Sequence, residues 1–141
     1  MNLQGLALPD NNDMTKAEVN KFEKVQAQVE GLYKEIGLLS RKSPNDGVNK
    51  FKLKFINQIL QEANRLLIGH YKPLDGFENF EVDEVPSNSD VAMILELYLN
   101  CLEKLRTDNV TTKEFEIGYF WIVDSKPSNI KTQKPKKLDL K

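Results

Sequence analysis

Residues 90–105 form the most apolar stretch of the chain, and they restrict its possible folds more than any other feature. After Asp90 the sequence reads VAMILELYLNCLEKL, and its polar interruptions are Glu96, Asn100, Glu103 and Lys104. A helix over these residues would be apolar around nearly its whole circumference, and such a helix needs neighbours on several sides. We therefore predict that this stretch is a central, buried helix.

The sequence before this stretch predicts two amphipathic helices joined by a short loop. Thr15 and Glu18 have the spacing of a capping box, so we expect a helix from Thr15 to about Ser40. Its apolar residues recur at spacings of three and four, as in a heptad seam, at Phe22, Val25, Val29, Leu32, Ile36 and Leu39. A wide apolar stripe predicts a second helix over residues 48–68. Because the loop at 41–47 is short, the two helices should be antiparallel neighbours.

Two glycines, Gly31 and Gly37, interrupt the first of these helices. A glycine inside a helix lowers its stability by about 1 kcal/mol relative to alanine. Each glycine therefore either permits a close contact between helices or marks a break.

The pattern becomes irregular between the second helix and the apolar stretch. Residues 69–88 contain two prolines, two glycines and a run of acids, which indicates a connector without regular structure. Within it, residues 80–85 are expected to form a short strand. Ser87 or Ser89 is expected to cap the helix that follows.

A change to period two after that helix predicts a β element. Residues 115–123 alternate aromatic and β-branched side chains with other residues, which is typical of a strand, and residues 130–133 should return to form a hairpin. The predicted fold class is mainly α, a three-helix antiparallel bundle with a central apolar helix and a small C-terminal β-hairpin. The predicted organisation is a flexible lead at 1–13, a single domain at 14–133 and a flexible basic tail at 134–141.

Composition restricts the class of protein. Hydrophobic residues make up 40% of the sequence and charged residues 29%, a balance typical of a folded globular protein. No apolar run approaches the ~20 residues of a membrane helix, so we expect no membrane partner. The single cysteine, Cys101, excludes a disulfide within the chain. A cytoplasmic location is the simplest interpretation.

The sequence lacks the usual motifs of catalysis and cofactor binding. It contains one histidine, His70, and one cysteine, and we interpret His70 as a helix-end residue and Cys101 as core packing. The acids of residues 75–84 lack the spacing of a calcium-binding loop, so we interpret them as solvated, or else as a cation site or a patch for a basic partner. Glycine-rich phosphate loops are also absent from the sequence. We therefore predict no metal, no cofactor and no enzymatic activity; an enzyme with dispersed carboxylates is the less favoured alternative.

The best functional hypothesis is a non-enzymatic accessory protein that assembles with itself or with a protein partner. Its positive support is the heptad seam and the apolar strand. We predict partner-binding residues at Tyr119, Trp121 and Val123, where an unpaired strand edge could pair with a partner's sheet and Trp121 could act as an anchor. The alternative is that this strand covers one side of the helices within the same chain.

A second hypothesis is an accessory factor that binds nucleic acid. The net charge is −1, but residues 41–54 carry five Lys/Arg and one Asp, and residues 126–141 also carry an excess of lysine. Clustered lysines can bind a phosphate backbone. The residues predicted for this role are Lys50, Lys52, Lys54, Lys134, Lys136 and Lys137.

Overall fold

The computed structural model describes residues 13–136, which divide into two compact units. The helical unit is residues 21–102, and the sheet unit combines residues 13–20 with residues 103–136. Whether they act as the single domain predicted for 14–133 stays a prediction. The predicted lead (except residue 13) and the last five residues of the predicted tail lie outside the described residues.

The described chain is mainly helical and has an antiparallel sheet near its C-terminal end, which confirms the fold class at that level. In chain order the elements are α2 (Lys16–Lys42), α3 (Lys50–Leu66), 3-10 turns at Gly69–Tyr71 and Val82–Glu84, α4 (Asn88–Asp108), β1 (Val110–Lys113), β2 (Glu116–Val123) and β3 (Lys126–Thr132).

Side-chain caps place the helix starts close to where the sequence predicts them. The amide of Thr15 donates to Glu18 Oε1 at 2.9 Å and the amide of Glu18 donates to Thr15 Oγ1 at 3.1 Å, so the capping box is confirmed. The amide of Asp90 likewise donates to Ser87 Oγ at 3.2 Å. These bonds satisfy amide donors that the first turn of a helix leaves without a partner.

Within the helical unit, α2 and α3 are antiparallel, as predicted. Lys21 pairs with Glu62 at 2.8 Å, whereas Glu35, further along α2, pairs with Lys52 near the start of α3 at 2.6 Å. The order of partners is reversed along the two helices, so the helices run in opposite directions. The apolar seam between them is buried, including Phe22, Val25, Val29, Ile36, Leu53, Ile56 and Leu60.

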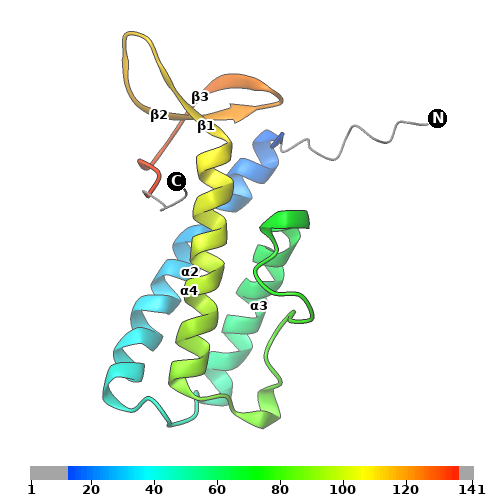
Figure 1. Ribbon diagram of the computed structural model, residues 1–141, viewed down its shortest axis with the longest axis vertical. Coiled ribbons are helices and arrows are strands. Elements are labelled where there is room, and N and C mark those ends of the chain that lie inside the picture. The colour runs from blue at the N-terminus through cyan, green and yellow to red at the C-terminus, as the bar shows by residue number, and fades with distance from the viewer. Residues whose placement is uncertain (1–12, 137–141) are drawn as a thin grey trace, which may run out of the picture. The chain divides into compact units, whose positions relative to one another are not determined.

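The third helix corrects the prediction of an all-antiparallel bundle, because α4 runs in the same direction as α3 (Figure 1). The amide of Asn88 at the start of α4 donates to Asp46 O at 2.8 Å, beside the start of α3. Further along both helices, the hydroxyl of Tyr98 donates to Asn64 Oδ1 at 2.6 Å. Since the two contacts follow one another in the same order along both helices, α3 and α4 are parallel.

The connector between α3 and α4 is responsible for this direction, because it returns along the length of α3. The Asn57 side chain exchanges two hydrogen bonds of 2.9 Å with the backbone of Phe80, and Asn64 Nδ2 donates to Glu78 O at 2.9 Å. The short strand predicted at 80–85 is wrong, since Val82–Glu84 is a 3-10 turn. The connector backbone is hydrogen-bonded to the side chains of Asn57 and Asn64 rather than to a neighbouring strand.

The sheet unit contains three strands in the order β1-β2-β3, where the sequence analysis predicted a two-stranded hairpin. The strand missed is β1, which pairs Val110 with Trp121. The turn between β2 and β3 has positive φ angles at Asp124 and Ser125. Two such residues suit the twist of a two-residue hairpin loop.

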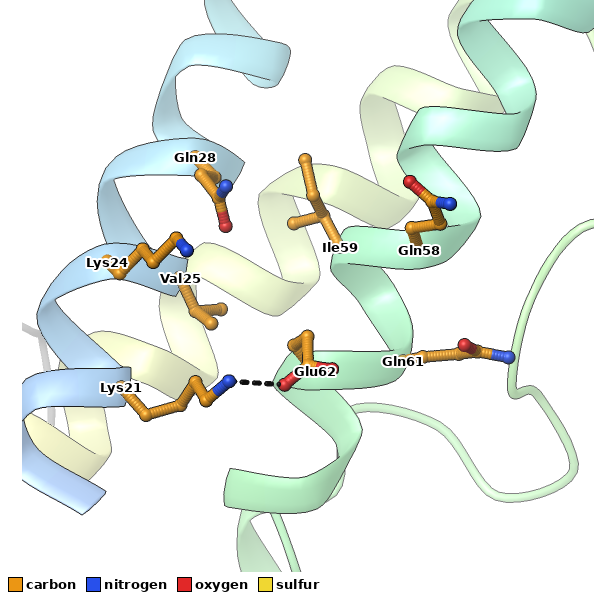
Figure 2. A pocket seen from close by; sticks show the side chains of 8 residues that line it. All are labelled: Lys21, Lys24, Val25, Gln28, Gln58, Ile59, Gln61 and Glu62. Atoms are coloured by element: carbon orange, nitrogen blue, oxygen red, sulfur yellow. Dashed lines mark ion pairs between the residues drawn. The ribbon is translucent and has the colours of Figure 1, made fainter. Parts of the chain in front are cut away.

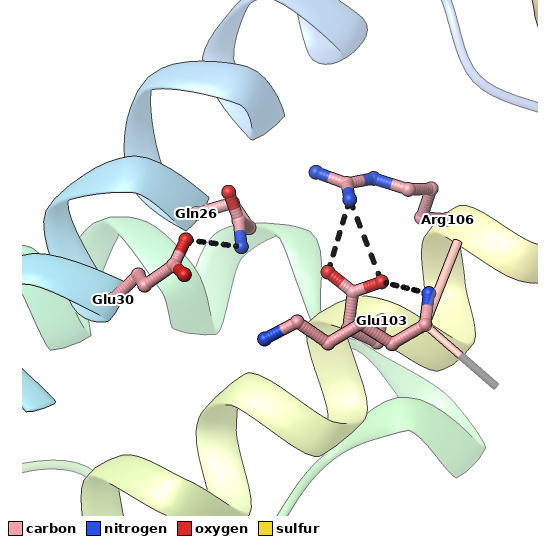
Figure 3. A network of polar contacts seen from close by, with 5 residues as sticks. Gln26, Glu30, Glu103 and Arg106 are labelled. Carbon is pink, nitrogen blue, oxygen red and sulfur yellow. Dashed lines mark hydrogen bonds and ion pairs between the residues drawn. The ribbon is translucent and has the colours of Figure 1, made fainter. Parts of the chain in front are cut away.

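Buried groups of the sheet unit include both aromatic residues at the centre of β2 and one ion pair. Phe120 and Trp121 are buried, together with Met14, whose carbonyl accepts from the amide of Asp124 at 3.0 Å. Glu103 and Arg106 are also buried, and Figure 3 shows the guanidinium of Arg106 directed at the Glu103 carboxylate, with Nη1 3.1 Å from Oε2. The amide of Lys136 donates to Glu103 Oε1 at 3.1 Å, so the predicted tail is bonded at this position.

Gly47 is expected to be intolerant of a side chain. A Cβ at this position would lie 2.3 Å from Val85 Cγ1 and 3.3 Å from the Val85 carbonyl oxygen. Val85 is itself held at φ 44, which is unfavourable for a β-branched residue. Gly47→Ala should therefore lower the free energy of unfolding by about 1–3 kcal/mol, measured by urea denaturation.

The control for this prediction is Gly31→Ala, because a Cβ at Gly31 meets nothing within 4 Å. That variant should be more stable than the wild type by roughly 0.5–1 kcal/mol. Equal effects of the two substitutions would contradict the assigned clash.

Candidate interaction surface

The hairpin tip, residues 113–118, presents the most exposed large apolar side chains among the described residues. Phe115 is 98% exposed and Ile117 is 90% exposed. They lie where β1 turns into β2, and Lys113 pairs with Glu116 across that turn (Figure 1). Exposed apolar groups gathered at one place commonly mark a site of interaction.

The charged side chains that point to solvent at the hairpin tip are acidic. The Lys113 ammonium donates to Asn129 Oδ1 at 2.8 Å and lies 4.3 Å from the centre of the Phe120 ring, so it is directed back onto the sheet. Glu114 and Glu116 are exposed, and neither forms an ion pair with any described residue. Phe115 is thus flanked by two carboxylates.

The backbone at the tip is held in an unusual conformation. Phe115 has φ 67, in the left-handed region, and Gly118 has φ 115. For a bulky residue other than glycine the left-handed region is unfavourable by about 1–3 kcal/mol, and such residues cluster at sites of function. The turn therefore holds an aromatic side chain in solvent although a glycine would suit its backbone better.

The three predicted partner-binding residues lie on β2 but are not its exposed residues. Trp121 is fully buried, and Tyr119 and Val123 are half-buried. β2 is the middle strand, so it offers no free edge. A partner-binding role for these three residues stays a prediction, while the accessible apolar surface of the same strand begins at Ile117.

Two of the three α3 lysines predicted to bind nucleic acid form ion pairs within the chain. Lys50 lies 3.4 Å from Asp83, and Lys52 lies 2.6 Å from Glu35. Lys54 is exposed, as are Lys134 and Lys136 in the sheet unit. Lys137 lies outside the described residues.

A polar hollow of about 390 Å³ lies between α2 and α3. Figure 2 shows its lining side chains: Lys21, Lys24, Val25, Gln28, Gln58, Ile59, Gln61 and Glu62. The hydrogen bond from Lys21 lowers the pKa of Glu62, so this acid and base neutralise each other. The hollow presents three amide side chains and three charged side chains, with Val25 and Ile59 as its apolar lining.

An apolar patch on α3 is the second place where aromatic rings reach solvent. Phe51 is 71% exposed, and its ring contacts Phe55 edge to face at 4.9 Å between centroids. Phe55 borders a hollow of about 300 Å³ between α2 and α3, together with Leu32 and Ile59. These rings are partly covered by their own chain, in contrast to the hairpin tip.

The other chemically reactive side chains, Cys101, Tyr98 and His70, lie in the helical unit. Burial raises the pKa of the Cys101 thiol, and burial raises the pKa of Tyr98 to about 12. His70 is exposed, and its ring lies 4.1 Å from that of Tyr71.

Among residues 13–136, no three His, Cys, Asp or Glu side chains are grouped as a metal site would require. In the same range, no helix has the length and apolarity needed to cross a bilayer.

Phe115 and Ile117 were not among the predicted partner-binding residues, because the sequence pattern includes them in the same apolar strand as Tyr119, Trp121 and Val123. The available signal was their neighbours, since Glu114 and Glu116 alternate with them and Gly118 follows. Comparison with known proteins adds no relative: no family model, curated protein or solved structure matches this chain.

Proposed function

We propose that this chain is a non-enzymatic interaction protein, a small three-helix bundle that docks onto a protein surface through its hairpin tip and assembles with itself. The observation that carries the proposal is the nearly complete exposure of Phe115 and Ile117. Transfer of an aromatic and a branched aliphatic side chain out of water would stabilise a complex by about 1.5–3 kcal/mol per side chain. A cytoplasmic location stays a prediction of the sequence.

The tip suits a protein surface better than a nucleic acid or an anionic lipid. Its two outward charges, Glu114 and Glu116, would be repelled by phosphate groups. Phe115 extends beyond the paired strands, and an aromatic side chain flanked by polar groups is the usual composition of a binding hot spot.

The experiment is sedimentation equilibrium of the purified chain up to about 100 µM, a range that detects a complex with a micromolar dissociation constant. We expect the wild type to self-associate at moderate salt, and Phe115→Ser with Ile117→Ser to sediment as a monomer. Circular dichroism should show that the double variant keeps its helical content.

Phe51→Ser is the control, because it removes another largely exposed ring, 71% exposed, from a different surface. It should leave the association constant unchanged. A monomeric Phe51→Ser variant with an associating tip variant would instead assign docking to the α3 patch. A wild type that stays monomeric yet binds DNA or RNA with steep salt dependence would favour the nucleic-acid hypothesis.

A further inference from the structure

We propose that the hairpin tip of one copy enters a groove around Gly37 on the helical unit of a second copy. This inference rests on the proposed function and names the surface that receives the tip. The groove consists of two adjoining hollows of about 280 and 340 Å³, each able to hold an aromatic ring. Both hollows are lined by Tyr33, Gly37 and Arg41.

The Gly37 groove exists because α4 is not covered on all sides, contrary to the prediction for residues 90–105. Met93 on α4 is 55% exposed and Leu38 on α2 is 56% exposed, and each borders one of the hollows. Small residues form much of the remaining lining, at Gly37, Ser40, Ser89 and Ala92. The groove therefore combines two exposed apolar side chains with several small residues.

Among the described residues, no neighbour of Gly37 requires a glycine in the middle of α2. A Cβ there would meet only Arg41 Nη1, at 4.0 Å. An alanine would thus fit and would favour the helix. The open space above Gly37 is available to a group that comes from outside the chain, which is what the tip would supply.

Charge complementarity selects the hairpin tip as the occupant. Lys34 and Arg41 line the groove, and neither forms an ion pair with any residue in the described range. Glu114 and Glu116 flank Phe115 and are equally without an ionic partner there. With Phe115 in a hollow, the two carboxylates that flank it meet these two cations. The one acid of the lining, Glu96, lies on the α4 side.

Filling the groove provides the first test. Gly37→Leu should keep or raise helix stability yet increase the dissociation constant of self-association about 30-fold, the effect of losing one hot-spot contact. Gly31→Leu is the matched control, since Gly31 is also inside α2 with open space around it and lies outside the groove. It should associate like the wild type, and equal loss in both variants would overturn the assignment.

Charge reversal provides the second test. Arg41→Glu with Lys34→Glu should abolish association, as should Glu114→Lys with Glu116→Lys. A mixture of the two double variants should form a complex again, because each brings the surface that the other lacks. Failure of the mixture to associate would overturn the pairing of these charges.

The two proposals fail differently in these experiments. If the tip variants become monomeric while all groove variants associate normally, the tip docks elsewhere and only the Gly37 groove is wrong. If neither set alters association, both proposals are wrong. In a Phe115→Cys, Met93→Cys variant, a disulfide confined to single chains would show that the tip occupies its own groove, which also contradicts the second-copy assignment.

Discussion

Replacing Glu103 by glutamine is expected to lower the free energy of unfolding by about 3–5 kcal/mol, because the substitution removes the buried negative charge that contacts the Arg106 guanidinium. The side chains of Arg106 and Glu103 are 0% and 2% exposed. Removal of one partner of such a pair is far more damaging than removal of both. The measurement is urea denaturation followed by the fluorescence of Trp121, the single tryptophan of the chain.

Two further variants make this result specific to the buried pair. Glu114→Gln removes an exposed carboxylate and should change the free energy of unfolding by less than about 0.5 kcal/mol. Glu103→Leu combined with Arg106→Leu should recover most of the lost stability, since neither buried charge remains. A double variant as unstable as Glu103→Gln would contradict the assigned ionic coupling.

Replacing Trp121 by alanine is expected to lower the free energy of unfolding by about 3–5 kcal/mol, the usual range for truncation of a buried tryptophan. Trp121 is fully buried, and its carbonyl accepts a hydrogen bond from Ser128 Oγ at 2.7 Å. Because this variant lacks the fluorescent reporter, thermal unfolding followed by circular dichroism is the appropriate measurement.

The comparison with Phe115→Ala separates a stabilising aromatic residue from a docking one. Phe115 is exposed, so its truncation should leave the stability within about 0.5 kcal/mol of the wild type while weakening self-association. If Trp121→Ala unfolds like the wild type but no longer associates, then Trp121 is the anchor that its sequence pattern first indicated.

Local sequence signals predicted the helices well because the determinants are themselves local. The exchange between Thr15 and Glu18 needs only their spacing, and the Ser87 cap needs only a hydroxyl before the helix. The seam from Phe22 to Ile36 is buried because apolar residues spaced three and four apart lie on one face of a helix, and that face packs against the core.

The errors arose where partners distant in sequence decide the structure. Val110–Lys113 is short and polar, and it becomes a strand because β2 is beside it. Proline is disfavoured in most strands, yet Pro127 occupies the outer strand β3, where a missing amide is tolerated. The direction of α4 depends on Asn57 and Asn64, whose side chains are ordinary surface residues in the sequence.

The proposed interaction surface was the least predictable part of the structure. Phe115 and Ile117 have the composition of a buried strand, and their exposure depends on what covers the end of the hairpin. The opening at Met93 has the same origin, since an apolar helix shows its uncovered side only after its neighbours are placed.

The division into two units also sets an order in which the chain can mature during synthesis. The helical unit is one uninterrupted segment, whereas the sheet unit joins residues 13–20 to residues 103–136. Met14 cannot meet Asp124 until the strands have left the ribosome. Residues 21–102 can therefore fold before residues 113–118 have been synthesised, so the proposed groove forms earlier in synthesis than the proposed docking tip.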